Sequence, residues 1–194
     1  MCVKKTILIL TALLIFIPIT NLSANTFAQE NLEESRALSK GLFSKLKHAL
    51  VTGMKEGGPT AAIAACSQKA QAITDRASNA RKGIKVRRTS LRLRNQKNAP
   101  DAWEIKGLEQ FEARVAAGES MKDMEYFSVV GSNGNKQFRY MKAIPASKPC
   151  MVCHGELVSL DVLKLIRAIY PLEQATGFKP GDLRGAFSVT KNID

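Results

Sequence analysis

The sequence predicts an α+β fold with an antiparallel sheet and helices packed against it. Two long segments near the start have apolar residues at helical spacing, and four short segments rich in β-branched and aromatic residues lie further along the chain. Ser132-Asn133-Gly134-Asn135 is a turn signal that joins two of these segments as a hairpin. Helices followed by hairpin-connected strands are typical of an α+β domain.

The first two predicted helices are separated by glycines. Residues 30–50 carry leucines at helical spacing on one face, with Glu, Arg and Lys on the other. Gly53 and Gly57-Gly58-Pro59 are expected to end this helix. A second helix is predicted from Pro59 to Asn79, because proline is tolerated in a first turn. Two further helices are predicted, at residues 101–118 and 160–170.

The predicted strands are short and lie on either side of the third helix. They are expected at residues 84–90, 125–131, 136–144 and 186–190. The third helix should bury Trp103, Leu108, Phe111 and Val115, and Gly118 should end it. No repeat or low-complexity segment interrupts this order, so one domain is expected.

Cys150-Met151-Val152-Cys153-His154 has the C-x-x-C-H spacing of a c-type haem attachment sequence. Each of the two thiols can add to a haem vinyl group, and the following His is then placed to bind iron. A redox-active C-x-x-C should open a helix after a strand. A zinc site would need a second pair of ligands at short spacing. Neither context is visible, so one covalently bound haem c is expected.

The N-terminus has the features of a Sec-type signal peptide. Lys4 and Lys5 precede an apolar run over residues 7–19, and Thr26-Phe27-Ala28 has a small-x-small cleavage pattern. We therefore expect residues 1–28 to be removed on export and residues 29–194 to form a single periplasmic domain. The apolar run is short for a transmembrane helix, and an uncleaved membrane anchor is the alternative. Bacteria attach haem by thioether bonds after export, which is consistent with both features.

The formal net charge of +12 limits the classes of partner. A basic protein can bind nucleic acid, anionic lipid or an acidic protein. An exported protein rarely meets nucleic acid, so none is expected. Haem propionates, an anionic membrane surface or an acidic redox or signalling partner remain, beside the simpler interpretation of a solvated basic surface.

Several stretches together resemble an exported family of c-type haem-binding domains. They are Arg88-Thr89-Ser90-Leu91-Arg92-Leu93-Arg94-Asn95, Asn98-Ala99-Pro100-Asp101-Ala102-Trp103-Glu104, Lys148-Pro149-Cys150-Met151-Val152-Cys153-His154-Gly155, Tyr170-Pro171, Ala175-Thr176-Gly177 and Gly181-Asp182-Leu183-Arg184-Gly185-Ala186. That family was long catalogued as a domain of unknown function. The resemblance implies a PAS-like fold over nearly all of residues 29–194, a haem with His and Cys as axial ligands, and a role in sensing redox state or small ligands.

The residues alone leave the second axial ligand open. The candidates are Cys66, His48 and the methionines Met54, Met121, Met124, Met141 and Met151. Cys66 is the one cysteine of residues 29–194 outside the attachment sequence, and a lone thiol in an oxidising compartment needs burial or a partner. The resemblance favours Cys66, since Ala62-Ile63-Ala64-Ala65-Cys66 matches the context of the family's ligand. The interpretation without a ligand role is a small buried residue.

Cys150, Cys153, His154 and Cys66 are thus the predicted haem site, and His154 and Cys66 the predicted iron ligands. His154 should donate its second ring N–H to a carbonyl or carboxylate that the sequence does not identify. Arg92, Arg94 and Arg184 are candidates to pair with propionates. We expect a periplasmic redox or small-ligand sensor that signals through a partner protein, with an electron-transfer cytochrome as the alternative. A haem enzyme ranks last, because two axial ligands leave no open position.

Overall fold

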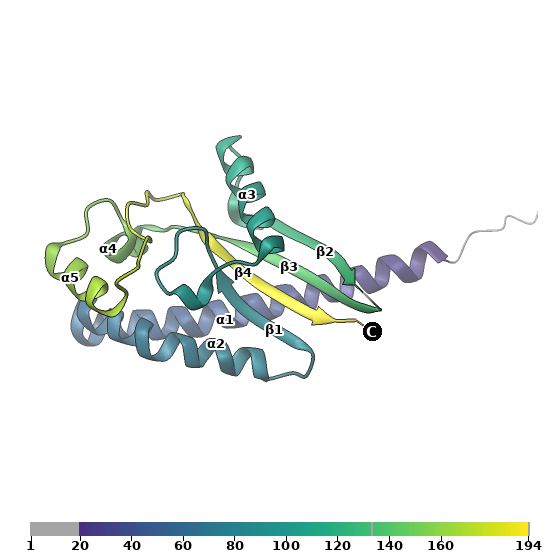
Figure 1. The fold of residues 1–194 in the computed structure, drawn as a ribbon, viewed down its shortest axis with the longest axis horizontal. Helices are drawn as coiled ribbons and strands as arrows, with labels where there is room; N and C mark the ends of the chain where they lie inside the picture. Colours follow the sequence, from purple (N-terminus) through teal and green to yellow (C-terminus); the bar gives the residue numbers. More distant parts are fainter. Residues whose placement is uncertain (1–19, 133, 194) are drawn as a thin grey trace, which may run out of the picture.

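The computed structural model describes residues 20–132 and 134–193, so the apolar run of the predicted signal peptide lies outside the described residues. The elements, in chain order, are α1 (Thr20–Ala64), the π-helical turn η1 (Ala65–Lys69), α2 (Ala70–Asn79), β1 (Ile84–Thr89), η2 (Gln96–Asn98), α3 (Ala102–Ala116), η3 (Met121–Asp123), β2 (Glu125–Ser132), β3 (Asn135–Pro145), η4 (Lys148–Cys150), α4 (Met151–His154), α5 (Leu160–Ile169) and β4 (Leu183–Asn192). The long α1 extends past one end of the sheet, and α4 and α5 lie together at the other end (Figure 1).

The four strands form one antiparallel sheet in the order β1-β4-β3-β2. The predicted hairpin is present, with Ser132 paired to Asn135. The last strand in the chain lies between β1 and β3, and it is longer at both ends than its sequence predicted. The expected α+β fold with an antiparallel sheet flanked by helices is therefore confirmed.

The sheet lies between two helical layers. On one face, Leu32 and Leu42 of α1 pack against Val86, Tyr140 and Val189. On the other face, Leu108 and Phe111 of α3 pack against Met141 and Ala186. Tyr140 and Met141 are neighbours in β3, and they belong to different cores because successive strand residues point to opposite faces. The prediction that Leu108 and Phe111 are buried is confirmed.

Gly53 does not end the first helix, contrary to the sequence prediction. The helix continues to Gly57 and Gly58, whose backbones are not helical, and a second helical segment then starts at Pro59. A Cβ at position 53 would lie 2.9 Å from the Cα of Ala62. Glycine therefore allows the two helical arms to approach closely, and this packing offsets its low helix propensity.

The third helix begins as the sequence predicted. Asp101 accepts hydrogen bonds from the N–H groups of Trp103 and Glu104, and Glu104 accepts one from the N–H of Asp101. This capping box satisfies N–H groups that have no partner within the helix. Glu104 is fully buried, and the guanidinium of Arg139 lies 3.7 Å from it.

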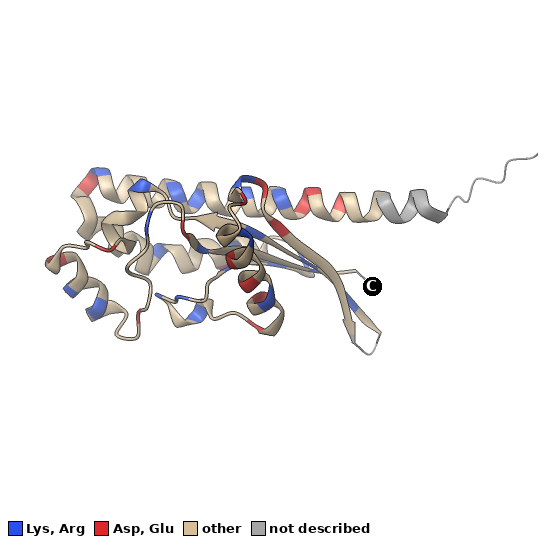
Figure 2. Ribbon diagram, turned by 90° about the horizontal axis from the view of Figure 1, so that it is seen from above, with Lys and Arg blue, Asp and Glu red and all other residues tan. Residues whose placement is uncertain are grey.

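Charged residues follow a simple pattern along α1. Its acidic residues lie mainly toward the start and most of its basic residues come later (Figure 2). Among the described residues, no helix has the length and apolar character needed to cross a membrane.

Candidate functional site

The attachment sequence forms a short helical segment made of η4 and α4. Cys150 and Cys153 are free thiols with intermediate exposure, and the Oγ of Ser147 lies 3.2 Å from the Sγ of Cys150. Gly155 ends the segment, because its N–H donates to the carbonyl of Met151 at 3.0 Å. A Cβ at Gly155 would lie 2.7 Å from that carbonyl oxygen, so this turn requires glycine. The two thiols are thus presented from one tight turn.

His154 is oriented by the segment from Glu173 to Phe178. The Nδ1 of His154 lies 2.7 Å from the carbonyl oxygen of Ala175. Because a carbonyl only accepts, Nδ1 carries the proton and the lone pair of Nε2 is free. The N–H of Phe178 donates to the carbonyl of His154 at 2.9 Å, and that of Gly177 donates to Gly155 at 2.8 Å. Ala175 is therefore the hydrogen-bond acceptor that the sequence could not identify.

The environment of His154 favours the neutral imidazole. Burial lowers the pKa of His154 well below its usual value of 6.5, and the nearby guanidinium groups of Arg184 and Arg94 lower it further. The hydrogen bond to Ala175 opposes this shift but does not cancel it. At neutral pH the ring is uncharged, which is the form that can bind a metal through Nε2.

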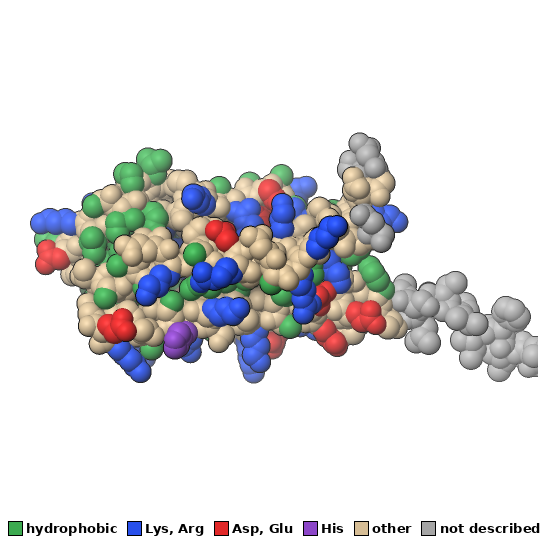
Figure 3. Space-filling model, turned by 90° about the horizontal axis from the view of Figure 1, so that it is seen from below, with side chains coloured by type: hydrophobic (Ala, Val, Ile, Leu, Met, Phe, Trp, Pro, Cys, Tyr) green, Lys and Arg blue, Asp and Glu red, His purple; other side chains and the backbone are tan. Residues whose placement is uncertain are grey.

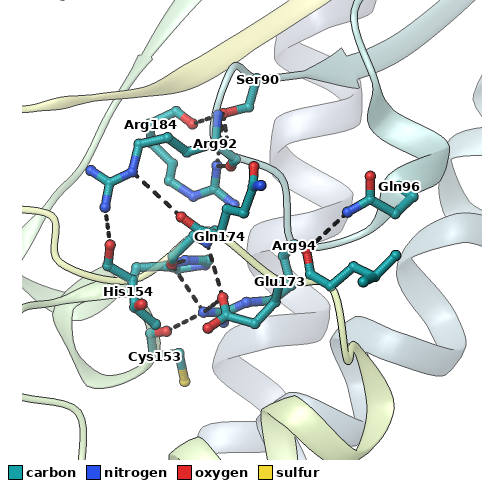
Figure 4. A network of polar contacts seen from close by, with 12 residues as sticks. Ser90, Arg92, Arg94, Gln96, Cys153, His154, Glu173, Gln174 and Arg184 are labelled. Atoms are coloured by element: carbon teal, nitrogen blue, oxygen red, sulfur yellow. Dashed lines mark hydrogen bonds and ion pairs between the residues drawn. The ribbon is translucent and has the colours of Figure 1, made fainter.

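Arg94 joins the attachment sequence to the segment that orients His154 (Figure 4). Its guanidinium donates to the carbonyls of Cys153 at 2.5 Å and Ala175 at 3.0 Å. It also lies 3.5 Å from the buried carboxylate of Glu173, which in turn accepts a hydrogen bond from the N–H of Ala175. Arg94 therefore links two backbone segments by donating to a carbonyl of each.

Arg92 and Arg184 also bind protein groups near His154. Arg92 donates to the carbonyl of Thr176 and lies 4.0 Å from the centre of the Phe178 ring. Arg184 donates to the Oγ of Ser90 at 3.2 Å and the carbonyl of Arg92 at 3.3 Å. Burial and the neighbouring cations lower the pKa of Arg184 to about 10. These contacts match the fold-holding role that the sequence left open beside pairing with propionates.

Cys66 lies in the π-helical turn η1 and its residue is exposed. Burial by the surrounding protein nevertheless raises the pKa of its thiol, while the cations Arg88 and Arg94 lower it. The helix that carries Cys66 also reaches the attachment sequence, because Ile63 packs in one apolar cluster with Cys153, Val162 and Ile166.

The structure brings the predicted site residues into one electrostatic environment. The charge of Arg94 affects the pKa values of Cys66, Cys153 and His154, and Cys66 raises the pKa of Cys153. Arg184 acts on His154 and is itself affected by Cys150. Residues from η1, the segment after β1, α4 and β4 therefore influence one another's pKa values.

Apart from Met151, which belongs to the attachment sequence, the other candidate axial ligands lie in other parts of the fold. His48 is exposed and lines a hollow of about 350 Å³ between α1 and η1, together with Glu56 and Lys69. Met121, Met124 and Met141 are buried in the core beneath α3, as expected for filler residues. Met151 packs against Ala146, Ala175 and Phe178, and Met54 is half-buried in α1. No group of three His, Cys, Asp or Glu residues that could hold a metal ion occurs within 20–132 and 134–193.

Apolar side chains surround the attachment sequence on the surface. The exposed ones are Val152, Leu157, Leu160, Ile169 and Leu172. Hydrophobic side chains gather at the end of the molecule that holds α5, and Lys and Arg are spread over the rest of the face in Figure 3. Exposed apolar side chains that lie together commonly mark a binding site for a ligand or a partner protein.

A family model for Tll0287-like domains matches residues 19–191. The chain belongs to the Tll0287-like family. The family resemblance drawn from the sequence motifs is therefore confirmed. The crystal structure of the cyanobacterial haem protein Tll0287 is similar to this Tll0287-like chain, with a TM-score of 0.57 and 24% sequence identity, over 92% of this chain and 98% of the other. This similarity establishes a shared fold. No curated protein matches the chain.

Sequence reasoning missed three residues of the site. Glu173 forms an ion pair with Arg94, and the carbonyl of Ala175 orients His154. Arg88 is the cation that most lowers the pKa of Cys66. Ala175 contributes only its backbone carbonyl, which no side-chain pattern can reveal. Arg88 has a signal in the sequence, because it follows Ile84 and Val86 at the two-residue spacing of one strand face.

Proposed function

We propose that this chain is an exported protein that carries one c-type haem, attached through Cys150 and Cys153, with His154 as an axial ligand. The observation that carries the proposal is the hydrogen bond that holds the Nδ1 of His154 on the carbonyl of Ala175 and leaves Nε2 free, within the C-x-x-C-H sequence. Two free thiols stand at the attachment spacing beside it. The haem-binding character of Tll0287, which shares this fold, supports the same cofactor here.

We infer that Cys66 is the second axial ligand. The residue is exposed, it raises the pKa of the Cys153 thiol, and the helix that precedes it contributes Ile63 to an apolar cluster against which Cys153 packs. The competing residues His48, Met121 and Met124 lie in other environments. A neutral imidazole, two attachment thiols and a third sulfur form a donor set that fits a c-type haem with His and Cys ligands.

The function we propose is periplasmic sensing of redox state or of a small ligand. A bound haem supplies reversible one-electron exchange and an affinity for small gases. Cys66 would bind as the thiolate, an anionic donor that favours ferric iron. A reduced haem, or one bound by a competing gas, would hold Cys66 less tightly, and Cys66 would then be released as a neutral thiol protonated by solvent. The resulting movement of η1 would be the signal that a partner protein reads.

Ferric EPR spectroscopy tests the ligand assignment. The wild-type protein should give low-spin signals typical of thiolate ligation, and Cys66→Ser should lose them. Ser67→Ala is a matched control, because its hydroxyl binds only the backbone carbonyl of Ala64 at 3.1 Å in the same turn. It should keep the wild-type signals. Signals that survive in Cys66→Ser would remove Cys66 from the iron.

Carbon monoxide binding separates the sensor from an electron carrier. A sensor that releases Cys66 on reduction should bind CO in the ferrous state, with a shift of the haem absorption bands. An electron carrier retains both ligands in both oxidation states. Ferrous protein that stays six-coordinate through sulfur and excludes CO would reject the switch and favour the carrier.

A further inference from the structure

A hollow of about 350 Å³ lies between the two helical arms that meet at the kink of α1. Gly53 and several alanines form the apolar part of its lining. The polar part consists of His48, Thr52, Glu56, Gln68 and Lys69. Sites for small ligands have volumes of roughly 300 to 1,000 Å³ and combine apolar walls with a few polar groups. The hollow therefore has the size and the lining of such a site.

The close approach of the two arms explains why the hollow exists. A Cβ at Gly53 would lie 2.9 Å from the Cα of Ala62, and a Cβ at Gly57 would lie 2.9 Å from the Cβ of Ala61. The arms are thus in direct contact near the kink. The alanines that line the hollow are too short to fill the remaining space between the arms.

The polar side chains of the hollow are available to a ligand. Over residues 20–132 and 134–193, none of these five side chains makes a hydrogen bond or an ion pair with another protein group. Charged residues earlier in the same helix are engaged, since Glu34 lies 2.6 Å from Lys191 and Arg36 lies 2.7 Å from Glu125. The hollow therefore collects donors and acceptors that the fold itself does not use.

The charges of the hollow are separated along its length. His48, Thr52 and Glu56 follow one another at four-residue intervals on one face of the first arm. At 1.5 Å per residue, the Cα atoms of His48 and Glu56 are about 12 Å apart, and Glu56 is the one beside the kink. The chain reverses after the kink (Figure 1), so Lys69, which lies well beyond Ala62 on the second arm, is toward the His48 end. One end is thus negative and the other positive.

The hollow shares a structural element with the proposed sulfur ligand. Ala65, Gln68 and Lys69 of the π-helical turn η1 line the hollow, and Cys66 belongs to the same turn. Single π-helical turns within α-helices are frequent at functional sites. A ligand that joins the first arm to Lys69 would hold η1 in place, whereas release of Cys66 requires η1 to move.

We propose that the hollow binds a small zwitterion of dipeptide size, with its carboxylate at Lys69 and its ammonium group at Glu56, and that this ligand retains Cys66 on the haem iron. An extended dipeptide spans about 7 Å. It fits between side chains that reach inward from backbone positions about 12 Å apart. The ligand site depends only on the hollow, and its regulatory effect rests on the proposed function.

Calorimetric titration of the haem-loaded protein with glycylglycine tests the ligand site. The wild type should bind one equivalent, and acetate or ethylamine, which each carry one charge, should bind at least about tenfold more weakly. Lys69→Met and Glu56→Gln should each weaken glycylglycine binding by at least about tenfold, because each removes one charged partner. Lys55→Met is the matched control, since Lys55 is exposed in the same arm but does not line the hollow. It should match the wild type.

Carbon monoxide binding tests the regulatory effect. Saturating glycylglycine should lower the CO affinity of the ferrous wild-type protein by about fivefold or more. Because such coupling is reciprocal, CO should weaken glycylglycine binding by the same factor. Lys69→Met should bind CO equally well with and without the dipeptide.

The outcomes separate the ligand site, its effect and the proposed function. A wild-type protein without saturable binding, or binding that Lys69→Met leaves unchanged, would overturn the ligand site. Acetate that binds as tightly as glycylglycine would overturn the zwitterion as the ligand class. Binding that depends on Lys69 but leaves the CO affinity unchanged would overturn the regulatory effect. Sulfur signals that persist in Cys66→Ser would overturn the proposed iron ligand, and the titration with glycylglycine would still decide the ligand site.

Discussion

The carbonyl oxygen of Ala175 lies 2.7 Å from the Nδ1 of His154, although the two residues are 21 positions apart. This contact decides which ring nitrogen is free to bind a metal. The segment that supplies the carbonyl is itself fixed, because Glu173 accepts from the N–H of Ala175 at 2.9 Å and lies 3.5 Å from Arg94. Hydrogen bonds and an ion pair thus hold the attachment sequence and its orienting segment together.

Loss of both attachment thiols should abolish covalent haem. Cys150→Ser/Cys153→Ser removes the two sulfur atoms that can form thioether bonds. We expect no haem stain on a denaturing gel, whereas the wild type and Cys66→Ser should both retain the stain. A double variant that keeps covalent haem would show that attachment takes place elsewhere in the chain.

Replacing the sulfur donor at position 66 should raise the reduction potential. In Cys66→Met an uncharged thioether takes the place of an anionic thiolate, and a thioether favours ferrous iron. Potentiometric titration should give a higher midpoint than the wild type, and the thiolate signals should disappear from the ferric EPR spectrum. A potential equal to that of the wild type would mean that residue 66 does not bind the iron.

The ion pair between Arg94 and Glu173 should contribute strongly to stability. Its side chains are 13% and 3% exposed, so Glu173→Gln leaves a buried guanidinium without its counter-charge. We expect a loss of about 3 kcal/mol in the free energy of unfolding, measured by urea titration. The matched control is Glu156→Gln, whose partner Lys179 lies 3.7 Å away at the surface. That change should cost no more than about 0.5 kcal/mol, and equal losses in the two variants would contradict the prediction.

Acid should destabilise the protein partly through Glu125. Burial raises the pKa of this carboxyl, but hydrogen bonds from Arg36 and Tyr140 outweigh burial, and the net pKa lies below the ordinary value of 4.5. The folded state therefore binds this proton less readily than the unfolded state. The resulting stability is complete above the unfolded pKa and is lost as the pH falls through the folded pKa.

Glu125→Gln should remove that part of the pH dependence. We expect a loss of about 2 kcal/mol at neutral pH. The urea midpoint should then fall less steeply between about pH 5 and pH 3 than in the wild type. Glu109→Gln, which changes an exposed carboxylate of α3, should keep the full wild-type fall. A wild-type slope in Glu125→Gln would assign the acid sensitivity to other groups.

Export should remove the N-terminal segment. N-terminal sequencing of the protein recovered from the periplasm of the expressing bacterium should begin at Gln29, as the pattern Thr26-Phe27-Ala28 predicts. Retention of residues 1–28 together with recovery in the membrane fraction would favour the uncleaved anchor. Replacement of Ala28 by a bulky residue should block cleavage at this position.

The site could be predicted from the sequence where its parts are close in the chain. Cys150, Cys153 and His154 lie within five residues, so their spacing is sufficient to indicate attachment of haem. The sequence left Arg92, Arg94 and Arg184 either as propionate partners or as residues that hold the fold together. In the structure they donate to backbone carbonyls and a hydroxyl of segments up to 94 residues away in the chain, which no local pattern could show.

The sequence by itself determined the α+β class and the four strands and predicted the attachment residues, because alternation, turn composition and motif spacing are local properties of the chain. Only the tertiary structure decided that Gly53 stays helical, that Ala175 orients His154, and that the Nε of Arg88 is left without an acceptor. The physical reason is the same in each case. Close packing of distant segments can offset a poor helix former, supply a backbone carbonyl or withhold a hydrogen-bond partner, and no local pattern records which segment will be the neighbour.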